Sequence, residues 1–320
     1  MILQGGGRGV LPRHDTATPR RSSYGSSVAG DRIFDPDLAR RLVLHEARAQ
    51  QTPARELRDL GDGWLLHDPS DAEPFWNRLI APRWPEDSAG FDRRLDEVIT
   101  LFASLARLPH IRPLSLGSEP ADMAQRLRAA GFVAMGAERR MVLVDVAGVS
   151  ERRAATEARV AATFGSGSVS VSREDVGSQP ARERRWGDRR RWAADAAMVL
   201  ADAFGVDSIR LLALENDVLA CISRPGCAML LVRVDGEPAA VARRASNEEG
   251  SYLSSIGTRP RFRRSGVGAL ATLLVLEDAL LAGGPTIHLA VEADNEAGRL
   301  LYEHLGFAVV GEPAPDLLLR

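Results

Sequence analysis

The chain has 320 residues, 45% of them hydrophobic and 26% charged, so it is long enough for two domains of ordinary size. Its net charge of −2 at pH 7 gives no overall attraction to nucleic acid or to membranes, and no apolar run approaches the length of a membrane span. All 41 basic residues are arginine, which excludes a Schiff-base lysine. We therefore expect no nucleic-acid partner and no membrane association.

Residues 1–32 lack the apolar segment of a secretory signal, and we expect a disordered tail. Cys221 and Cys227 are the two cysteines, too few for a disulfide scaffold. They indicate a reducing compartment, so we expect a cytoplasmic protein.

The first half alternates short strands with helices. A helix opens at Asp35-Pro36, and a second has Leu95, Val98 and Phe102 at helical spacing. Residues 60–63 form a turn. The remaining predicted elements are strands at 64–67, 76–80, 111–116 and 140–146 and a helix at 121–130.

The second half begins with a polar helix or linker at 148–167. Residues 183–192 are rich in Arg and Trp, which suggests either a docking surface or a solvated segment whose tryptophans pack on the domain, and we favour the second. The other predicted elements are strands at 168–173, 228–234, 238–244, 252–258 and 286–291 and helices at 192–204, 207–222 and 296–305. Asp235-Gly236 predicts a tight turn between two of these strands, and Gly283-Gly284-Pro285 ends a further apolar helix.

The chain also contains an internal repeat. Gly131-Phe132 followed by Gly136 matches Gly306-Phe307 followed by Gly311 at an offset of 175 residues. The same offset places the strand at 111–116 on the one at 286–291 and the helix near 95 on the helix near 270. We read this as a tandem duplication.

Arg263, Gly266 and Gly268 give the spacing R-x-x-G-x-G where a strand passes into a helix. The first turn of a helix has unpaired N–H groups and partial positive charge, so it attracts a phosphate. Glycine lets the phosphate approach the backbone closely.

This turn is followed by a helix, a strand, Asn295, a helix containing Tyr302, and Gly306-Phe307. In this order and spacing the second half resembles the GNAT superfamily of acetyl-CoA-dependent N-acyltransferases. The resemblance implies an α/β (α+β) fold of two tandem GNAT-like domains, each a mixed, mostly antiparallel sheet flanked by helices. It also implies acetyl-CoA as co-substrate. None of the six histidines forms a metal-ligand spacing with another His or Cys, so we expect no metal.

Residues of the motif take roles from the resemblance. The backbone near the glycines binds the diphosphate, the end of the preceding strand pairs with the pantetheine arm, and Asn295 contacts the coenzyme besides capping its helix. The predicted coenzyme-binding residues are Ile256, Gly257, Thr258, Arg263, Arg264, Ser265, Gly266, Val267, Gly268, Ala269, Asn295 and Tyr302.

Acyl transfer also needs an acid and a deprotonated amine. The resemblance gives Tyr302 as the general acid to the departing thiolate. Where relatives often carry an acidic base, this chain has Ser251 and Tyr252. Glu292 is then the candidate base, and a water relay is the alternative.

Shifted by 175 residues, the motif falls on Ser88, Phe91 and Arg93, which lack the two glycines. We therefore expect a degenerate GNAT-like domain at 33–147, a linker at 148–167 and a catalytic GNAT domain at 168–320. The first copy would pack on the second and wall one side of the acceptor cleft.

The predicted function is transfer of an acetyl group from acetyl-CoA to a primary amine, with a small-molecule acceptor slightly favoured. The alternatives are a non-catalytic acyl-CoA-binding sensor and a protein N-terminal or lysine acetyltransferase. We expect a monomer or a homodimer.

Overall fold

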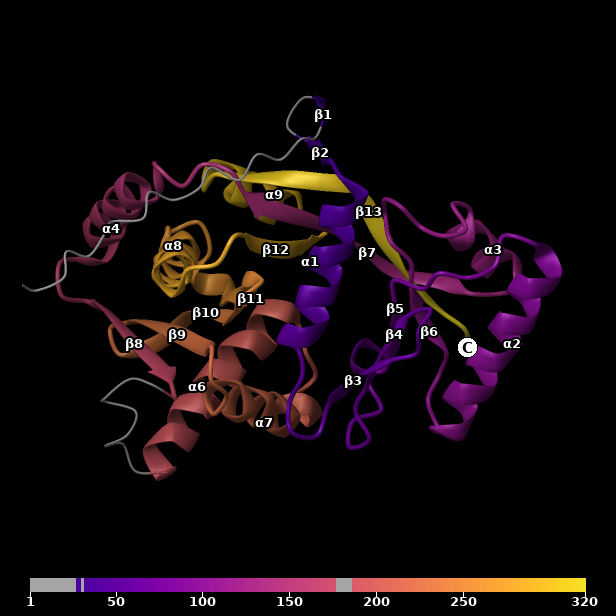
Figure 1. The fold of residues 1–320 in the computed structure, drawn as a ribbon. Helices are drawn as coiled ribbons and strands as arrows, with labels where there is room; N and C mark the ends of the chain where they lie inside the picture. Colours follow the sequence, from indigo (N-terminus) through magenta and orange to yellow (C-terminus); the bar gives the residue numbers. More distant parts are fainter. Residues whose placement is uncertain (1–26, 30–31, 177–185) are drawn as a thin grey trace, which may run out of the picture.

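The computed structural model describes residues 27–29, 32–176 and 186–320, which fold around one continuous mixed sheet (Figure 1). The predicted tail lies almost wholly outside these residues, as do residues 183–185 of the basic cluster. The strand order is β3-β4-β5-β6-β13-β7-β12-β11-β10-β9-β8, with β2 joined to β13 and β1 to β2. The mixed α/β class agrees with the prediction.

Within its described residues, the first half contains two long helices and seven strands. Asp35 caps the first helix by accepting a hydrogen bond from the Leu38 N–H, and Pro36 fits its first turn. The last strand is longer than the predicted 140–146. In order, the elements are β1 (Ser27–Ala29), β2 (Arg32–Phe34), α1 (Pro36–Ala49), β3 (Glu56–Asp59), β4 (Trp64–His67), a 3₁₀ turn (Pro74–Trp76), β5 (Arg78–Ile80), α2 (Ser88–Ser104), β6 (His110–Arg112), α3 (Met123–Ala129) and β7 (Val133–Leu143).

In the second half a helix fills the predicted linker. Asp235 and Gly236 both have positive φ, which fits the tight turn predicted between two strands. The elements are α4 (Val149–Phe164), β8 (Val169–Asp175), α6 (Trp186–Phe204), a 3₁₀ turn (Ser208–Arg210), α7 (Leu211–Ile222), β9 (Cys227–Val234), β10 (Glu237–Asn247), β11 (Gly250–Thr258), a 3₁₀ turn (Pro260–Phe262), α8 (Val267–Ala282), β12 (Ile287–Glu292), α9 (Glu296–His304) and β13 (Phe307–Leu318).

The elements of the two halves recur at the offset of 175 residues. Adding 175 to the bounds of α1 gives 211–224, which overlaps α7, and adding it to those of β7 gives 308–318, which lies within β13. The same shift places β3, β4, β5, α2, β6 and α3 on β9, β10, β11, α8, β12 and α9. The repeat found in the sequence is therefore also a repeat of elements.

The two halves exchange their last strands. β7, from the first half, lies between β12 and β13, with Leu289 opposite Met141. β13, from the second half, lies between β7 and β6, with Leu317 opposite Ile111. Each half thus completes the sheet of the other.

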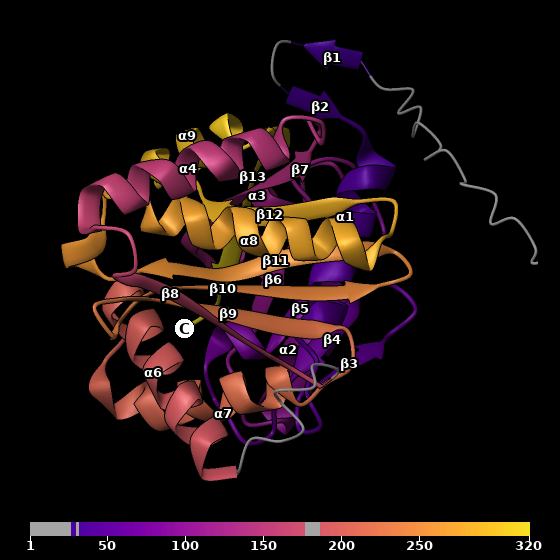
Figure 2. The ribbon, with the colours of Figure 1, turned by 90° about the vertical axis from the view of Figure 1, so that its left-hand side faces the viewer.

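Helices cover both faces of the sheet in the second half (Figure 2). α8 packs on β9–β12 and α4 packs on α8, whereas α6 and α7 pack on the opposite face. Val160 of α4 and Val267 of α8 belong to one buried apolar cluster. The helix at the predicted linker is therefore part of the core.

α1 crosses the seam between the halves and carries a buried carboxylate over the sheet. Glu46 accepts hydrogen bonds from Arg78 of β5, Arg112 of β6 and Arg140 of β7, at 2.8 to 3.1 Å. All four side chains are buried. Arg112 also pairs with Glu138. This network joins three strands of the first half beneath α1, and one of them, β7, lies between two strands of the second half.

Candidate functional site

The predicted diphosphate site is the turn between β11 and α8. Gly266 (φ 90°) and Arg264 (φ 63°) both adopt left-handed backbone conformations before the helix begins at Val267. No side chain caps α8, and its first intrahelical bond joins the Leu270 N–H to the Gly266 carbonyl. The N–H groups of the first turn are thus open to an anion.

The two glycines fit tightly against the rest of the chain. A Cβ on Gly268 would lie 2.4 Å from Oγ1 of Thr258, and one on Gly266 would lie 3.1 Å from Cγ2 of Val160. Packing within the protein therefore requires small residues here, a reason that the sequence pattern did not reveal.

The predicted basic and polar residues of the turn have different surroundings. Arg263 donates to the carbonyls of Thr258 (3.3 Å) and Ala203 (2.9 Å), which ties the turn to the end of α6. Ser265 donates to the Phe262 carbonyl at 2.6 Å. Arg264 is exposed. Both arginines are exposed, but the side chain of Arg263 fastens the loop.

β11 changes its pairing just before this turn. Ser255 has φ 48°, and the register with β10 shifts between Val241 and Arg243. The pairing with β12 ends at Leu253 opposite Leu289, although β11 continues to Thr258. Ile256 and Gly257 therefore follow a bulge on a strand segment that no longer pairs with β12.

Tyr302 lies on α9. The side chain is 8% exposed, packs in the same apolar cluster as Val267, and contacts the ring of Phe307. Burial raises the pKa of Tyr302 to about 12. The phenol therefore keeps its proton throughout the neutral range.

Asn295 and Glu292 flank the loop between β12 and α9. Asn295 caps α9 by accepting a hydrogen bond from the Gly298 N–H at 2.9 Å, as predicted. Glu292 is exposed at the end of β12, opposite Glu138 of β7.

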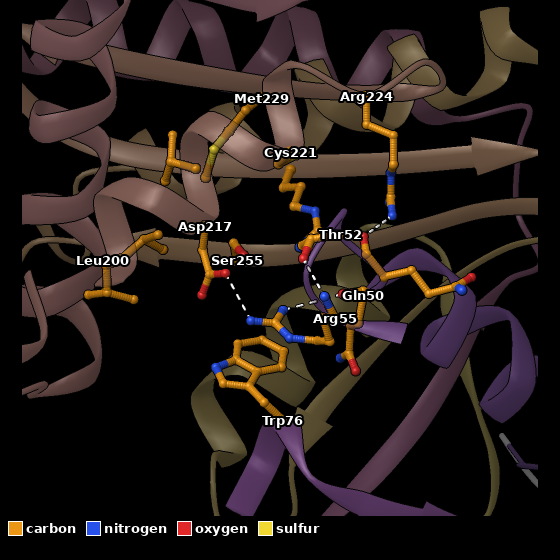
Figure 3. A pocket seen from close by; sticks show the side chains of 14 residues that line it. Gln50, Thr52, Arg55, Trp76, Leu200, Asp217, Cys221, Arg224, Met229 and Ser255 are labelled. Carbon is orange, nitrogen blue, oxygen red and sulfur yellow. Dashed lines mark hydrogen bonds and ion pairs between the residues drawn. The ribbon is translucent and has the colours of Figure 1, made fainter. Parts of the chain in front are cut away.

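A cavity of about 80 Å³ lies at the seam between the halves (Figure 3). Arg55 and Trp76 reach it from the first half, and Asp217 and Ser255 from the second. It is lined by Gln50, Gln51, Thr52, Arg55, Trp76, Leu200, Leu214, Asp217, Val218, Cys221, Arg224, Met229, Arg243 and Ser255. Because Ser255 marks the bulge of β11, the cavity adjoins the strand segment predicted to bind pantetheine.

The charged groups of this cavity are held in place by one another. Arg55 donates from Nη2 to Asp217 (2.9 Å) and from Nε to Asp68 (3.1 Å), and its guanidinium lies 3.5 Å from the ring centroid of Trp76. Burial raises the pKa of Asp217, although Arg55 opposes this effect. Sequence reasoning missed Asp217, a single aspartate within the apolar helix α7.

Two buried cysteines lie near this cavity. Cys221 lines it, and Cys227 belongs to the same buried cluster. Arg224 donates to Sγ of Cys227 from Nε (3.2 Å) and Nη2 (2.9 Å). A hydrogen bond from Cys221, together with the charges of Arg243 and Arg224, lowers the pKa of Cys227 to about 5, against the effect of burial. Arg243 also donates to the Ala49 carbonyl of α1.

At the corresponding turn of the first half, a side chain caps the helix. Asp87 caps α2, and its carboxylate accepts a hydrogen bond from the Gly90 N–H at 2.7 Å. Phe91 is buried and Arg93 is exposed. The protein's own carboxylate thus occupies the N-terminus of α2.

The basic segment at 183–192 is described from Trp186 onward. Trp192 is buried and donates from Nε1 to Oγ of Ser172 at 2.8 Å, whereas Trp186 is exposed. One tryptophan therefore docks on the domain, as we favoured from the sequence. No helix in the described part of the chain has the length and apolar character needed to cross a membrane.

Part of the second half matches a known protein family. Residues 195–307 match the model of the acetyltransferase (GNAT) family. A mycothiol acetyltransferase from Nocardiopsis dassonvillei is 46% identical over 54 residues, which are 17% of this chain and 16% of that protein. The chain thus aligns with only about a sixth of the length of this curated relative.

Solved structures agree over most of the chain. A GCN5-related N-acetyltransferase from Kribbella flavida superposes with a TM-score of 0.57 at 20% identity, over 87% of this chain and 96% of that one. A tandem GNAT protein from the clavulanic acid biosynthesis pathway gives a TM-score of 0.52 at 15% identity, over 84% and 83%. The match to the acetyltransferase (GNAT) family thus covers residues 195–307 in the second half, and the chain shares its fold with these two structures.

Proposed function

We propose that the protein is an N-acetyltransferase that transfers an acetyl group from acetyl-CoA to a primary amine. The observation that carries the proposal is the uncapped N-terminus of α8, directly after a bulged strand whose pairing with β12 has ended. A diphosphate fits the free N–H groups of the helix, and an extended pantetheine arm fits the edge of β11 that no longer pairs with β12.

In this proposal the coenzyme is bound mainly by backbone groups. The N–H groups of residues 264–269 bind the diphosphate, and Ile256, Gly257 and Thr258 pair with pantetheine. Arg264 adds an exposed positive charge, whereas Arg263 holds the turn in place through the Thr258 and Ala203 carbonyls. Asn295 contributes through its cap of α9, which sets the start of the helix that carries Tyr302.

Tyr302 acts as the acid for the departing thiolate. Its hydroxyl is protonated at neutral pH because burial raises its pKa. As the carbon–sulfur bond breaks, the sulfur gains negative charge and receives this proton. Glu292 stays a proposed base on the exposed side of β12, with a water relay as the alternative.

The first half is proposed to be a degenerate copy that binds no coenzyme. Asp87 already occupies the N-terminus of α2, and a second anion there would meet its negative charge. The domain boundaries at 33–147, 148–167 and 168–320 describe the repeat along the chain, with the last strand of each half exchanged.

The test is an assay of acetyl-CoA-dependent thiol release with a panel of amines. We expect turnover with at least one small primary amine. Tight coenzyme binding without acetylation of any amine would instead support the acyl-CoA sensor, and turnover only with peptides would support a protein acetyltransferase.

A further inference from the structure

The seam cavity has a carboxylate at one end and guanidinium groups at the other. At the first end Arg55 is shared by two carboxylates, Asp68 and Asp217, which leaves a net negative charge. Arg55 is almost fully buried, but the Asp217 side chain is 31% exposed. Asp217 is therefore the carboxylate of this pair that a ligand can reach.

At the other end, two guanidinium groups lie near a single sulfur. Arg224 donates to Cys227 and to the backbone carbonyls of Gln51 and Ala49. Arg243 donates to Ala49 and forms no ion pair with a described carboxylate. Arg224 and Arg243 together stay positively charged whether Cys227 is a thiol or a thiolate, so the cavity carries charges of both signs.

The cavity also lies next to the strand segment that is proposed to bind pantetheine. Ser255, which marks the bulge of β11, and Leu200 of α6 are part of its wall. Gly257, two residues after the bulge, packs against α6, where an added Cβ would lie 2.9 Å from that of Ala203. The cavity and the proposed pantetheine segment thus share one stretch of strand.

We propose that this cavity is the acceptor site and that it takes a small primary amine that also carries an anionic group, as an amino acid does. The inference rests on the proposed function. Asp217 receives the amine, Arg224 and Arg243 face the anionic group, and Arg55 and Trp76 of the first half position Asp217. The first half is then a necessary wall of the acceptor site.

The reaction balances with these groups. The ammonium gives one proton to Asp217, which passes it to water, and the nitrogen lone pair forms the carbon–nitrogen bond. The carbon–sulfur bond breaks with its electron pair on sulfur, which takes the Tyr302 proton. The second proton lost from nitrogen restores Tyr302 through solvent, so one proton is released for each amide formed.

The first experiment compares Asp217→Asn with wild type in thiol release, using amino acids as acceptors. We expect kcat/KM for the amine to fall about 100-fold, as for loss of a general base, with acetyl-CoA affinity within about threefold of wild type. The matched control is Glu215→Gln: Glu215 is on the same helix, pairs with Arg190 at 3.1 Å and does not line the cavity. Its kcat/KM should stay within about threefold of wild type.

Glu292→Gln separates the two candidate bases. We expect it to lower kcat/KM less than Asp217→Asn does, because Asp217 takes the proton. A loss in Glu292→Gln with none in Asp217→Asn would overturn the inference and leave the proposed function intact.

Arg55→Gln tests the positioning role of the first half. Burial raises the pKa of Asp217, and without Arg55 only Arg243 opposes that effect, so the acidic limb of the kcat/KM profile should move to higher pH. A merely structural role would lower activity at every pH without moving the limb, and that result would overturn this assignment.

The substrate class is tested by comparing each amino acid with its carboxamide. We expect the free acid to be acetylated with at least tenfold higher kcat/KM, and faster reaction of the amide would overturn the proposed class. If wild type acetylates no amine, the proposed function fails. Calorimetric titration of amino acids into the CoA complex then decides: binding that Asp217→Asn weakens at least tenfold supports the site, and binding that is absent or unaffected contradicts it.

Discussion

Oε2 of Glu46 lies 2.8 Å from Nη2 of Arg140, although Glu46 belongs to a helix of the first half and Arg140 to a strand inserted beside the second. Burial alone would raise the pKa of Glu46, but Arg112, Arg140 and Arg78 hold it at about 2. A carboxylate whose folded pKa is depressed stabilises the fold above its unfolded pKa and loses that effect as the pH falls.

We therefore expect acid destabilisation between about pH 4.5, the ordinary pKa, and about pH 2. Glu46→Gln should cost about 3–5 kcal/mol at pH 7, because three buried guanidinium groups lose their anion. It should also flatten the pH dependence in this window, as measured by urea unfolding. Glu97→Gln, in an exposed pair with Arg94, should cost no more than about 1 kcal/mol. Equal losses in the two variants would contradict the role of Glu46.

The exchanged strands predict that the second half does not fold alone. A chain of residues 149–320 lacks β7, so β12 and β13 lose the strand that pairs with both. We expect it to aggregate or to self-associate through these edges. Addition of the segment 32–147 as a separate chain should restore a soluble complex that binds acetyl-CoA. A monomeric, coenzyme-binding 149–320 chain would show that the exchange is dispensable.

Variants of Gly268 and Thr258 test whether the turn needs glycine for packing within the protein or for contact with phosphate. Gly268→Ala should weaken acetyl-CoA binding at least tenfold, because the new Cβ meets Oγ1 of Thr258 and displaces the turn. Thr258→Ala removes that oxygen, so the double variant should bind within about threefold of Thr258→Ala alone. Binding that stays weak in the double variant would instead show that the glycine is needed for contact with phosphate.

Tyr302→Phe should lower kcat about 100-fold or more and leave acetyl-CoA affinity unchanged, since only the proton donor is lost. Steady-state kinetics and calorimetry measure the two quantities. The control is Tyr252→Phe, a buried tyrosine beneath α1 in contact with His288. A kcat for Tyr302→Phe within twofold of wild type would exclude the acid role.

Much of this architecture could be predicted because local patterns were strong. The Asp235-Gly236 turn and the Asn295 cap depend on nearby residues, and the repeat offset can be read by aligning the chain with itself. The structure contains each of them. The exchange of β7 and β13 depends on pairing between distant segments. Either pairing buries similar apolar residues, so the pattern along each strand does not distinguish them.

The candidate site, too, could be predicted from the sequence only in part. The turn around Gly266 was visible as a short motif, but the Arg55–Asp217 pair joins residues 162 positions apart. Arg263 matched the motif, yet its guanidinium contacts backbone carbonyls that no spacing rule identifies. Contacts across the seam between the two halves could be identified only from the fold.

The central claim is that one helix N-terminus, that of α8, binds the coenzyme. Calorimetric titration of the full chain with acetyl-CoA tests it most directly, because α2 carries its own carboxylate and α8 has no side-chain cap. The account predicts one molecule of acetyl-CoA per chain. A stoichiometry of two, or no binding at all, would contradict it.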